Sequence, residues 1–422
     1  MAQNFVQGSI VKLQRIAITG MKRNKPLALS SMKFCNYSSS AQQGSEEAKV
    51  AGTVKSVFIS QSNDIFTNLA LEDWLYRNFD FTNHHILLLW QNSPAVVIGR
   101  HQNPWLEANT AVLSEHGIEI ARRNSGGGTV YHDRGNLNLT FFTPREHYSR
   151  KNNLQLICRA LLREWGLKTE ISPREDIVSG NYKQISGTAA KLGRPNAYHH
   201  CTLLVDVDKV KLGHALHKHN KGIKTNATQS IPSPVMNLCD LNSHVKMEKL
   251  LASIGWEYLR TDPYSAEDKG EDFIGKQRGF QFINPTDQWF PGLEKLRAEF
   301  ASWGWRFGKS PKFNVTRTFR VPRELLSKDE LTDQELSITI DVNKGVVEDV
   351  LLTVPPRLAA AKGFSGQAQV VTSLRGQQFS EEAITMLQKA LSELESPEQT
   401  RNEFVVHCMR TCILALEDEK NN

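Results

Sequence analysis

The chain has 422 residues, of which 40% are hydrophobic, and carries a formal net charge of +6. This length is sufficient for two or three domains with buried cores. Because no run approaches the roughly 20 apolar residues that cross a bilayer, we expect a soluble mature protein with no membrane partner.

The excess positive charge lies at the N-terminus. The first 44 residues contain no acidic residue but six basic ones, namely Lys12, Arg15, Lys22, Arg23, Lys25 and Lys33. Removing these six from the 51 Lys and Arg leaves 45, which equals the 45 Asp and Glu, so the remainder gives no support for nucleic-acid binding. A basic, Ser-containing segment without acidic residues is typical of a mitochondrial transit peptide, to which we assign residues 1–45 as a disordered leader. A disordered basic tail is the alternative.

The cysteines are few and dispersed, which argues against a disulfide scaffold. They are Cys35, Cys158, Cys201, Cys239, Cys408 and Cys412. A reduced compartment such as the mitochondrial matrix fits this usage.

The region after residue 55 is predicted to alternate strands and helices. Strands are predicted at 57–59, 86–90, 95–99, 136–141 and 198–205. The strands at 86–90 and 95–99 flank a turn at 91–94 and are predicted to form one strand-turn-strand unit. Helices are predicted after the capping residues 62–64, over 109–117 and over 154–165, the last of them ended by Gly166. A hairpin is predicted from 176–178 and 183–189, around a turn at 179–181. The apolar strands indicate a sheet covered on both faces, and the alternation of 136–141 puts its asparagines on one face, towards a site.

The most unusual stretch is 122–133, Arg-Arg-Asn-Ser-Gly-Gly-Gly-Thr-Val-Tyr-His-Asp. Three consecutive glycines let the backbone bend sharply and approach a ligand closely. Free amides at such a bend, with the guanidinium groups of Arg122 and Arg123, would suit a carboxylate or phosphate. The stretch matches neither the Gly-Lys-Ser/Thr phosphate loop nor the G-x-G-x-x-G motif. A glycine-rich hairpin with two solvated arginines is the alternative interpretation.

Further along, a basic helix-like stretch at 209–224 contains His214, His217 and His219. No other ligand is spaced to complete a metal site, so we favour a solvated face. The polar, Pro-containing residues 222–235 predict a loop over a site. Residues 261–291 are predicted to be a connector. A second, smaller unit is predicted from a strand at 316–321, a hairpin at 336–354 and helices at 381–394 and 402–416.

Several motifs together resemble the lipoate–protein ligase and lipoyltransferase family. The matching stretches, in chain order, are Trp90, 96–105, 122–133, 183–189, 199–204 and 305–313. Their order and spacing extend over about residues 57–315, and the N-terminus indicates the mitochondrial lipoyltransferases within this family. The resemblance implies an α/β (α+β) fold with a mixed-sheet catalytic domain of the biotin/lipoate ligase type at 55–290 and a small α+β accessory domain at 291–422.

The implied activity is transfer of a lipoyl group to a specific lysine of lipoyl domains in 2-oxoacid dehydrogenase complexes. The implied donors are lipoyl adenylate and the lipoylated H protein of glycine cleavage. No tightly bound cofactor and no nucleic acid are implied, and we expect a monomer. An ATP-dependent lipoate–protein ligase and a non-catalytic lipoyl-domain binder remain as alternatives.

The resemblance also implies roles for individual residues. Lys183 falls on the family's essential lysine, which we expect beside the glycine-rich stretch. Positions that bind the lipoyl chain or its adenylate are Arg123, Ser125, Gly126, Gly127, Gly128, Ala189, His200 and Thr202. His200 is either a proton relay or a structurally bonded histidine. Asp176 would help to hold Mg²⁺ if lipoate activation is retained, and Cys201 is either an acyl carrier by way of a thioester or, as we favour, a packing residue.

Two departures from the bacterial ligases bear on activation of free lipoate. Glu175 stands where those ligases generally have asparagine, and the loop at 226–232 has no arginine where many of them have several. Because fewer cations neutralise a triphosphate less well, we expect acyl transfer with poor ATP-dependent activation.

Overall fold

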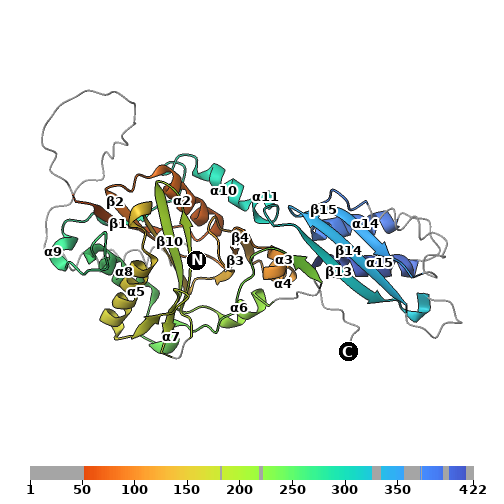
Figure 1. Cartoon of the computed structure of the whole chain (residues 1–422), viewed down its shortest axis with the longest axis horizontal. Helices are drawn as coiled ribbons and strands as arrows, with labels where there is room; N and C mark the ends of the chain where they lie inside the picture. Colours follow the sequence, from red (N-terminus) through yellow and green to blue (C-terminus); the bar gives the residue numbers. More distant parts are fainter. Residues whose placement is uncertain are drawn as a thin grey trace, which may run out of the picture.

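The computed structural model describes residues 52–180, 183–217, 222–325, 334–355, 371, 373–392 and 399–414. The predicted transit peptide and His219 lie outside these residues. Figure 1 shows two parts, a large α/β unit and a smaller α+β unit at the C-terminal end of the chain. In the described part, no helix combines the length and apolarity that crossing a membrane requires.

A six-stranded sheet forms the centre of the large unit. Its order is β12-β1-β2-β6-β10-β9. The strands are β1 (Val54–Ser60), β2 (His84–Trp90), β6 (Asn136–Pro144), β9 (Ser186–Leu192), β10 (Asn196–Leu204) and β12 (Gly279–Ile283). The β12-β1-β2 pairs are parallel and the pairs from β2 to β9 are antiparallel, so the expected mixed sheet is confirmed.

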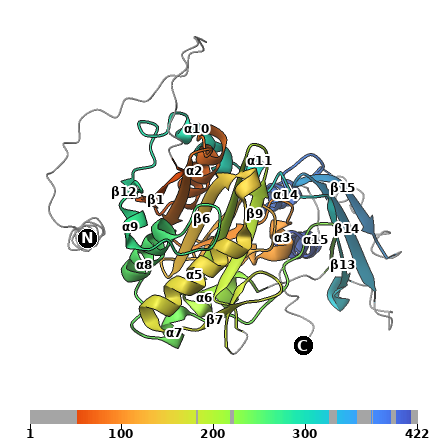
Figure 2. The same ribbon diagram turned by 60° about the vertical axis from the view of Figure 1, so that its left-hand side comes forward.

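Helices cover both faces of this sheet, which explains the apolar strands (Figure 2). Along β2, Leu87 and Leu89 pack against α5 (Arg150–Trp165) and α8 (Met247–Arg260). The alternate residues Ile86, Leu88 and Trp90 pack towards α2 (Ile65–Asn78) and α10 (Leu293–Ala301). Asp64 caps the N-terminus of α2, and Gly166 in a left-handed conformation ends α5, as predicted.

A second, three-stranded sheet has the order β4-β3-β5. It consists of β3 (Ala95–Ile98), β4 (Glu119–Arg122) and β5 (Val130–His132). The predicted strand-turn-strand unit of 86–99 is therefore wrong in its pairing, because β2 and β3 belong to different sheets. Residues 123–129, which we call the glycine segment, cross from β4 to β5 past the end of β3.

Two other predictions about strands are wrong. The 261–291 connector contains β12, whose parallel pairing with β1 makes it an edge of the main sheet. The 176–189 hairpin is reduced to a single bridge between Val178 and Gln184, because β8 (Ile177–Ser179) pairs with β7 (Thr169–Ile171) and β9 pairs with β10. Local turn signals at 179–181 favoured the hairpin, but each of the two strands pairs instead with its neighbour on the other side along the chain.

Short elements connect these layers. They are α3 (Pro104–Glu107), α4 (Thr110–Glu115), a 3₁₀ turn at Arg145–His147, α6 (Lys209–Ala215), α7 (Leu238–Leu241), α9 (Glu271–Ile274) and α11 (Trp303–Arg306).

The smaller unit is a four-stranded sheet of order β11-β13-β14-β15. It comprises β11 (Ile223–Thr225), β13 (Phe313–Arg320), β14 (Glu335–Asn343) and β15 (Val346–Thr353), packed against α14 (Glu381–Ser392) and α15 (Gln399–Leu414), with a 3₁₀ turn at Arg323–Leu325. The predicted hairpin around Asn343–Gly345 is confirmed, with Lys344 and Gly345 both at positive φ. The large unit extends beyond the expected boundary at residue 291, because α2 packs with Leu293, Phe300 and Trp305. The boundary between the two units lies near Phe313, where β13 begins.

Candidate active site

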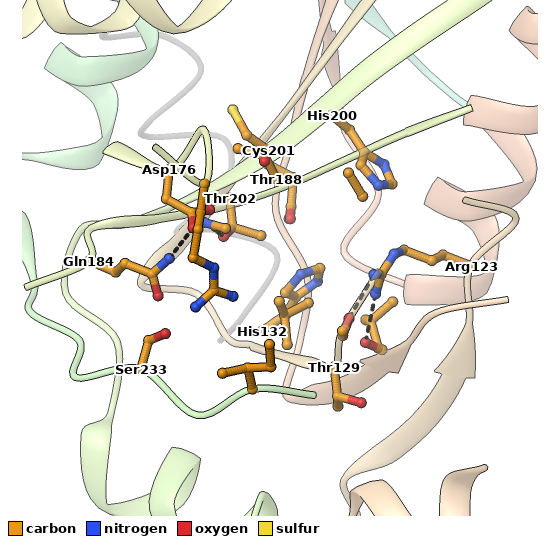
Figure 3. A pocket seen from close by; sticks show the side chains of 18 of the residues that line it. Arg123, Thr129, His132, Asp176, Gln184, Thr188, His200, Cys201, Thr202 and Ser233 are labelled. Atoms are coloured by element: carbon orange, nitrogen blue, oxygen red, sulfur yellow. Dashed lines mark hydrogen bonds between the residues drawn. The ribbon is translucent and has the colours of Figure 1, made fainter. Parts of the chain in front are cut away.

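A pocket of about 170 Å³, the inner pocket, lies between the main sheet and the glycine segment (Figure 3). The buried residues of its lining include Leu69, Trp90, Val97, Arg123, His132, Asn138, His200 and Cys201, and Figure 3 shows Arg123 and His200 at one side. The other side is more polar and more open, with Arg174, Asp176, Gln184, Thr188, Ile231 and Ser233. Asn138 lies on the polar face of β6 that the alternation of 136–141 predicted.

A larger cavity of about 530 Å³, the outer pocket, adjoins the first. Residues shared by both linings are Thr129, Val130, Gln184, Gly187, Thr202, Ile231 and Ser233. The outer pocket extends to Tyr131, Asn136, Leu212 of α6 and Leu216, which directly follows α6. Together the two cavities can hold a ligand with a narrow end and a broad end.

Close contacts of main chain explain the glycines. An added Cβ at Gly99, at the end of β3, would lie 2.1 Å from the carbonyl oxygen of Gly127. Gly127 itself has φ of +90°, which L-residues rarely adopt. The glycine segment therefore rests directly on the backbone of the neighbouring strand.

The two arginines hold this segment from within. Arg122 is fully buried, and its guanidinium donates to five carbonyl oxygens and to Ser310 Oγ. No pair of its N–H groups is therefore free to bind an anion. The expectation that Arg122 binds a ligand is therefore wrong. Arg123 lines the inner pocket, but donates to the carbonyls of Val97, Gly126 and Gly128 and to Ser125 Oγ. Burial lowers the pKa of both groups to about 10, so both stay charged at neutral pH.

A buried chain of hydrogen bonds joins Arg123 to Glu72 of α2. Ser125 Oγ accepts from Arg123 Nε at 3.0 Å and donates to His200 Nε2 at 2.8 Å. His200 Nδ1 then carries the ring proton and donates to Glu72 Oε1 at 2.8 Å. Burial opposes the Glu72 carboxylate, but His200 and the hydroxyl of Thr140 outweigh it and hold the pKa of Glu72 below its ordinary value. Both nitrogens of His200 are thus occupied, which favours the structural alternative over the proton relay.

His132 lies between these groups and the polar side of the inner pocket in Figure 3. It is 3% exposed, and Asn92 donates to its Nδ1 at 2.9 Å. Burial, together with Arg123 and His200, lowers the pKa of His132 to about 3, so the ring is neutral at neutral pH.

Asp176 stands at the polar side with Gln184, whose amide donates to its carboxylate. Burial raises the pKa of Asp176 above its ordinary value, opposed mainly by nearby Arg174. Across the described residues, no group of three or more His, Cys, Asp or Glu is placed to hold a metal ion. One carboxylate with one amide still suits Mg²⁺ if a bound phosphate supplies further oxygens.

Lys183 is exposed and lines neither pocket, although its neighbour Gln184 lines both. The expected position of its ammonium beside the glycine segment is therefore not seen. The main chain here is anchored, because Lys183 O accepts from Ser179 N at 3.0 Å and Gln184 N donates to Pro234 O at 2.9 Å. No hydrogen bond or ion pair of the ammonium with another described residue holds the side chain away from the mouth. The catalytic role of Lys183 stays a prediction.

Residues 226–235, the covering loop, close one wall of both pockets, as the sequence predicted. Ser230 Oγ accepts from the amide of Thr129 at 2.7 Å and from Gln102 Nε2 at 3.0 Å. Ile231 lines both pockets while remaining 69% exposed. The loop follows β11, which pairs with β13, so the small unit is connected directly to the wall of the site.

Of the other predicted residues, Gly128, Ala189, Thr202 and Cys201 line the inner pocket. Ser125, Gly126 and Gly127 belong to the glycine segment but line neither pocket. Ala189 and Thr202 line the inner pocket from β9 and β10, and Thr202 Oγ1 accepts from Gly187 N at 3.0 Å. Cys201 is 3% exposed, and burial raises the pKa of its thiol far above the ordinary value. A protonated thiol is a poor nucleophile, which favours the packing interpretation of Cys201.

Four residues of the site had no role in the sequence interpretation, namely Glu72, His132, Arg174 and Gln184. Glu72 had one weak signal, since it and Asp73 stand between the apolar residues Leu71 and Trp74 of the predicted helix. His132 stood within the glycine-rich motif, but its orientation depends on Asn92 of another segment. Gln184 stood within the matching stretch 183–189 but was given no role of its own, and Arg174 carried no local signal.

Comparisons with known proteins agree with this arrangement. Residues 64–256 match the family model described as the lipoyl protein ligase A/B catalytic domain. The chain is 40% identical over 343 residues to human "Lipoyl amidotransferase LIPT1, mitochondrial", covering 80% of this chain and 86% of the relative. It is 37% identical over 253 residues to lipoate-protein ligase A of Psychrobacter cryohalolentis, covering 58% of this chain and 70% of the relative.

Among solved structures, P. falciparum LipL1 in complex with lipoate matches with a TM-score of 0.52. The sequences are 22% identical, and the match covers 84% of this chain and 99% of that one. At this identity the likeness supports the fold.

Proposed function

The chain belongs to the family of lipoyl amidotransferases and lipoate–protein ligases, and from that premise we propose that it transfers a lipoyl group from an activated donor to the lysine of a lipoyl domain. It is an acyltransferase, and it acts in mitochondria. The natural acceptors are lipoyl domains of 2-oxoacid dehydrogenase complexes, and the H protein of glycine cleavage is a donor. We propose that it acts as a monomer.

One observation carries the proposal, namely the narrow inner pocket that joins a broader outer pocket beneath the glycine segment. Lipoyl adenylate has matching parts, because its acyl chain is slender and its nucleotide is broad. With the acyl chain in the inner pocket and the nucleotide in the outer one, the reactive carbonyl lies near Gln184, Gly187 and Thr202, which both cavities share.

Transfer then proceeds by attack of the neutral acceptor amine on this carbonyl carbon. An amide bond forms, the bond from the carbonyl carbon to the phosphate oxygen breaks, AMP leaves, and the amine releases its proton to water. Negative charge develops on the carbonyl and phosphate oxygens, so a cation placed there lowers the barrier. We assign this role to Lys183, which is exposed and directly precedes Gln184 in the chain. The assignment requires that its side chain turns towards the mouth when the donor is bound.

We propose that the same chain activates free lipoate poorly. The covering loop, Asn-Ala-Thr-Gln-Ser-Ile-Pro-Ser-Pro-Val, contains no cation, and Arg174 is the one arginine at the open side among the described residues that line the inner pocket. A triphosphate needs more neutralisation than the single phosphate of an adenylate. Where activation occurs, Asp176 would hold Mg²⁺ together with the donor's phosphates.

A complete ATP-dependent ligase is the second candidate. It is favoured by the 37% identity to a protein named lipoate-protein ligase A and by the presence of Asp176 in the pocket. A non-catalytic lipoyl-domain binder is the third, and it predicts no turnover with any donor.

The test is mass spectrometry of a lipoyl domain incubated with the enzyme and lipoyl adenylate. Lys183→Ala should lower kcat/KM at least about 100-fold while still binding the adenylate, because it removes charge stabilisation of the transition state. Lys249→Ala is the matched control, since Lys249 is an exposed lysine of α8 paired with Glu164 and lines neither pocket. Equal rates for the Lys183→Ala and Lys249→Ala enzymes would contradict the assignment.

A further inference from the structure

The inner pocket contains a polar group that no described residue satisfies. His132 lines the pocket from β5, and its Nε2 is buried without a hydrogen-bond partner. The nearby ring of Trp90 meets the His132 ring edge to face, with centroids 6.1 Å apart, and thereby fixes its orientation.

The protonation of this nitrogen follows from a relay of side chains. The amide nitrogen of Asn68 donates to the carbonyl oxygens of Ser62 and Gln91, which fixes the orientation of the amide, and the same nitrogen donates to Asn92 Oδ1 at 2.9 Å. The amide nitrogen of Asn92 must then donate to His132 Nδ1, at 2.9 Å. Because Nδ1 is the acceptor and the ring is neutral, the proton of His132 resides on Nε2.

A buried N–H without a hydrogen-bond acceptor is unfavourable, so we expect the ligand that fills the pocket to supply one.

The lysine of the lipoyl domain must reach the reactive carbonyl from outside, which places the carbonyl at the polar, open side with Asp176 and Gln184. The far end of the acyl chain therefore points to the opposite side, towards His132 (Figure 3) and the Trp90 ring that contacts it.

We propose that His132 Nε2–H donates to a sulfur of the lipoyl ring and selects lipoyl over straight-chain acyl groups. This inference rests on the proposed function. Ring sulfurs are weak hydrogen-bond acceptors, whereas the end of a plain eight-carbon chain has no acceptor. An octanoyl group would leave the N–H unsatisfied, so this site disfavours it in the way that polar pockets reject ligands lacking the matching group.

The test compares the equilibrium binding of two non-reactive adenylate analogues, lipoyl and octanoyl sulfamoyl adenosine. His132→Phe keeps a flat ring but removes the N–H, and should lower the ratio of lipoyl to octanoyl affinity about tenfold. His199→Phe is the matched control. His199 is equally buried, has a lowered pKa and an unpartnered Nε2, but packs on the opposite face of the main sheet against Phe141 and lines neither pocket. Its ratio should equal that of the wild type.

His132→Gln restores an amide N–H and should keep the ratio within about threefold of the wild type. An unchanged ratio in His132→Phe, or equal ratios in the Phe and Gln variants, would overturn the inference. Wild-type protein that binds both analogues but transfers no lipoyl group from lipoyl adenylate would instead contradict the proposed function, so the two failures are distinguishable.

Discussion

Gly99→Ala should inactivate transfer by moving the glycine segment. The new Cβ would lie 2.1 Å from Gly127 O, whereas carbon and oxygen rarely approach within about 3.2 Å, so the segment must shift by about 1 Å. A misplacement of this size costs about 100-fold in rate, which corresponds to about 2.7 kcal/mol of transition-state stabilisation. The effect is expected in kcat/KM for transfer from lipoyl adenylate.

Gly304→Ala is the control, because Gly304 of α11 has only one ordinary contact near the added Cβ and lies outside both pockets. Thermal unfolding of both variants separates a local shift from loss of the fold. A folded Gly99→Ala enzyme with wild-type kcat/KM would refute the argument that the backbone of β3 positions the glycine segment.

Three further outcomes are expected. Glu175 has φ of +60°, a conformation that asparagine tolerates better, and its ion pair with Arg150 is partly exposed to solvent. Glu175→Asn should therefore raise the free energy of unfolding by about 0.5 kcal/mol in denaturant melts. A loss of stability would contradict this. Burial lowers the pKa of His84 to about 4 and of His85 and His132 to about 3. The unfolded chain therefore binds more protons than the native one below pH 6.5, so the free energy of unfolding should fall from pH 6.5 to 4, by up to about 1.4 kcal/mol per pH unit for each histidine. The fall should be less steep in His132→Phe. Equal dependence of the unfolding free energy on pH in the wild type and in His132→Phe would count against a neutral His132. Cys201→Ala should keep the rate of transfer within about threefold, since burial keeps its thiol protonated, and a loss above 100-fold would revive the acyl-carrier hypothesis.

Short-range sequence signals predicted the helices and turns correctly, but they did not predict which strands pair with each other. The Asp64 cap, the Gly166 terminator and the 336–354 hairpin each depend on residues adjacent in the chain, and each is confirmed. The partner of a strand depends on distant residues. For that reason β3 pairs with β4 instead of forming a unit with β2, and residues 279–283 form a strand beside β1 in the main sheet.

In the site, too, the features within one short stretch could be predicted, and those that depend on distant residues could not. The glycine segment and the polar face of β6 could be predicted because their chemistry is contained in single short stretches. The structural role of Arg122 could not be predicted, because half of its acceptors lie on Trp305, Arg306 and Ser310, which are 183 to 188 residues away. Nor could the tautomer of His132, which is set through Asn92 and Asn68.

The most direct test of the account supplies three donors separately to the enzyme and one lipoyl domain. They are lipoyl adenylate, lipoylated H protein, and free lipoate with ATP and Mg²⁺. The account predicts acceptor modification from the two activated donors at least 100-fold faster than from free lipoate with ATP. Equal efficiency with free lipoate and ATP would contradict it.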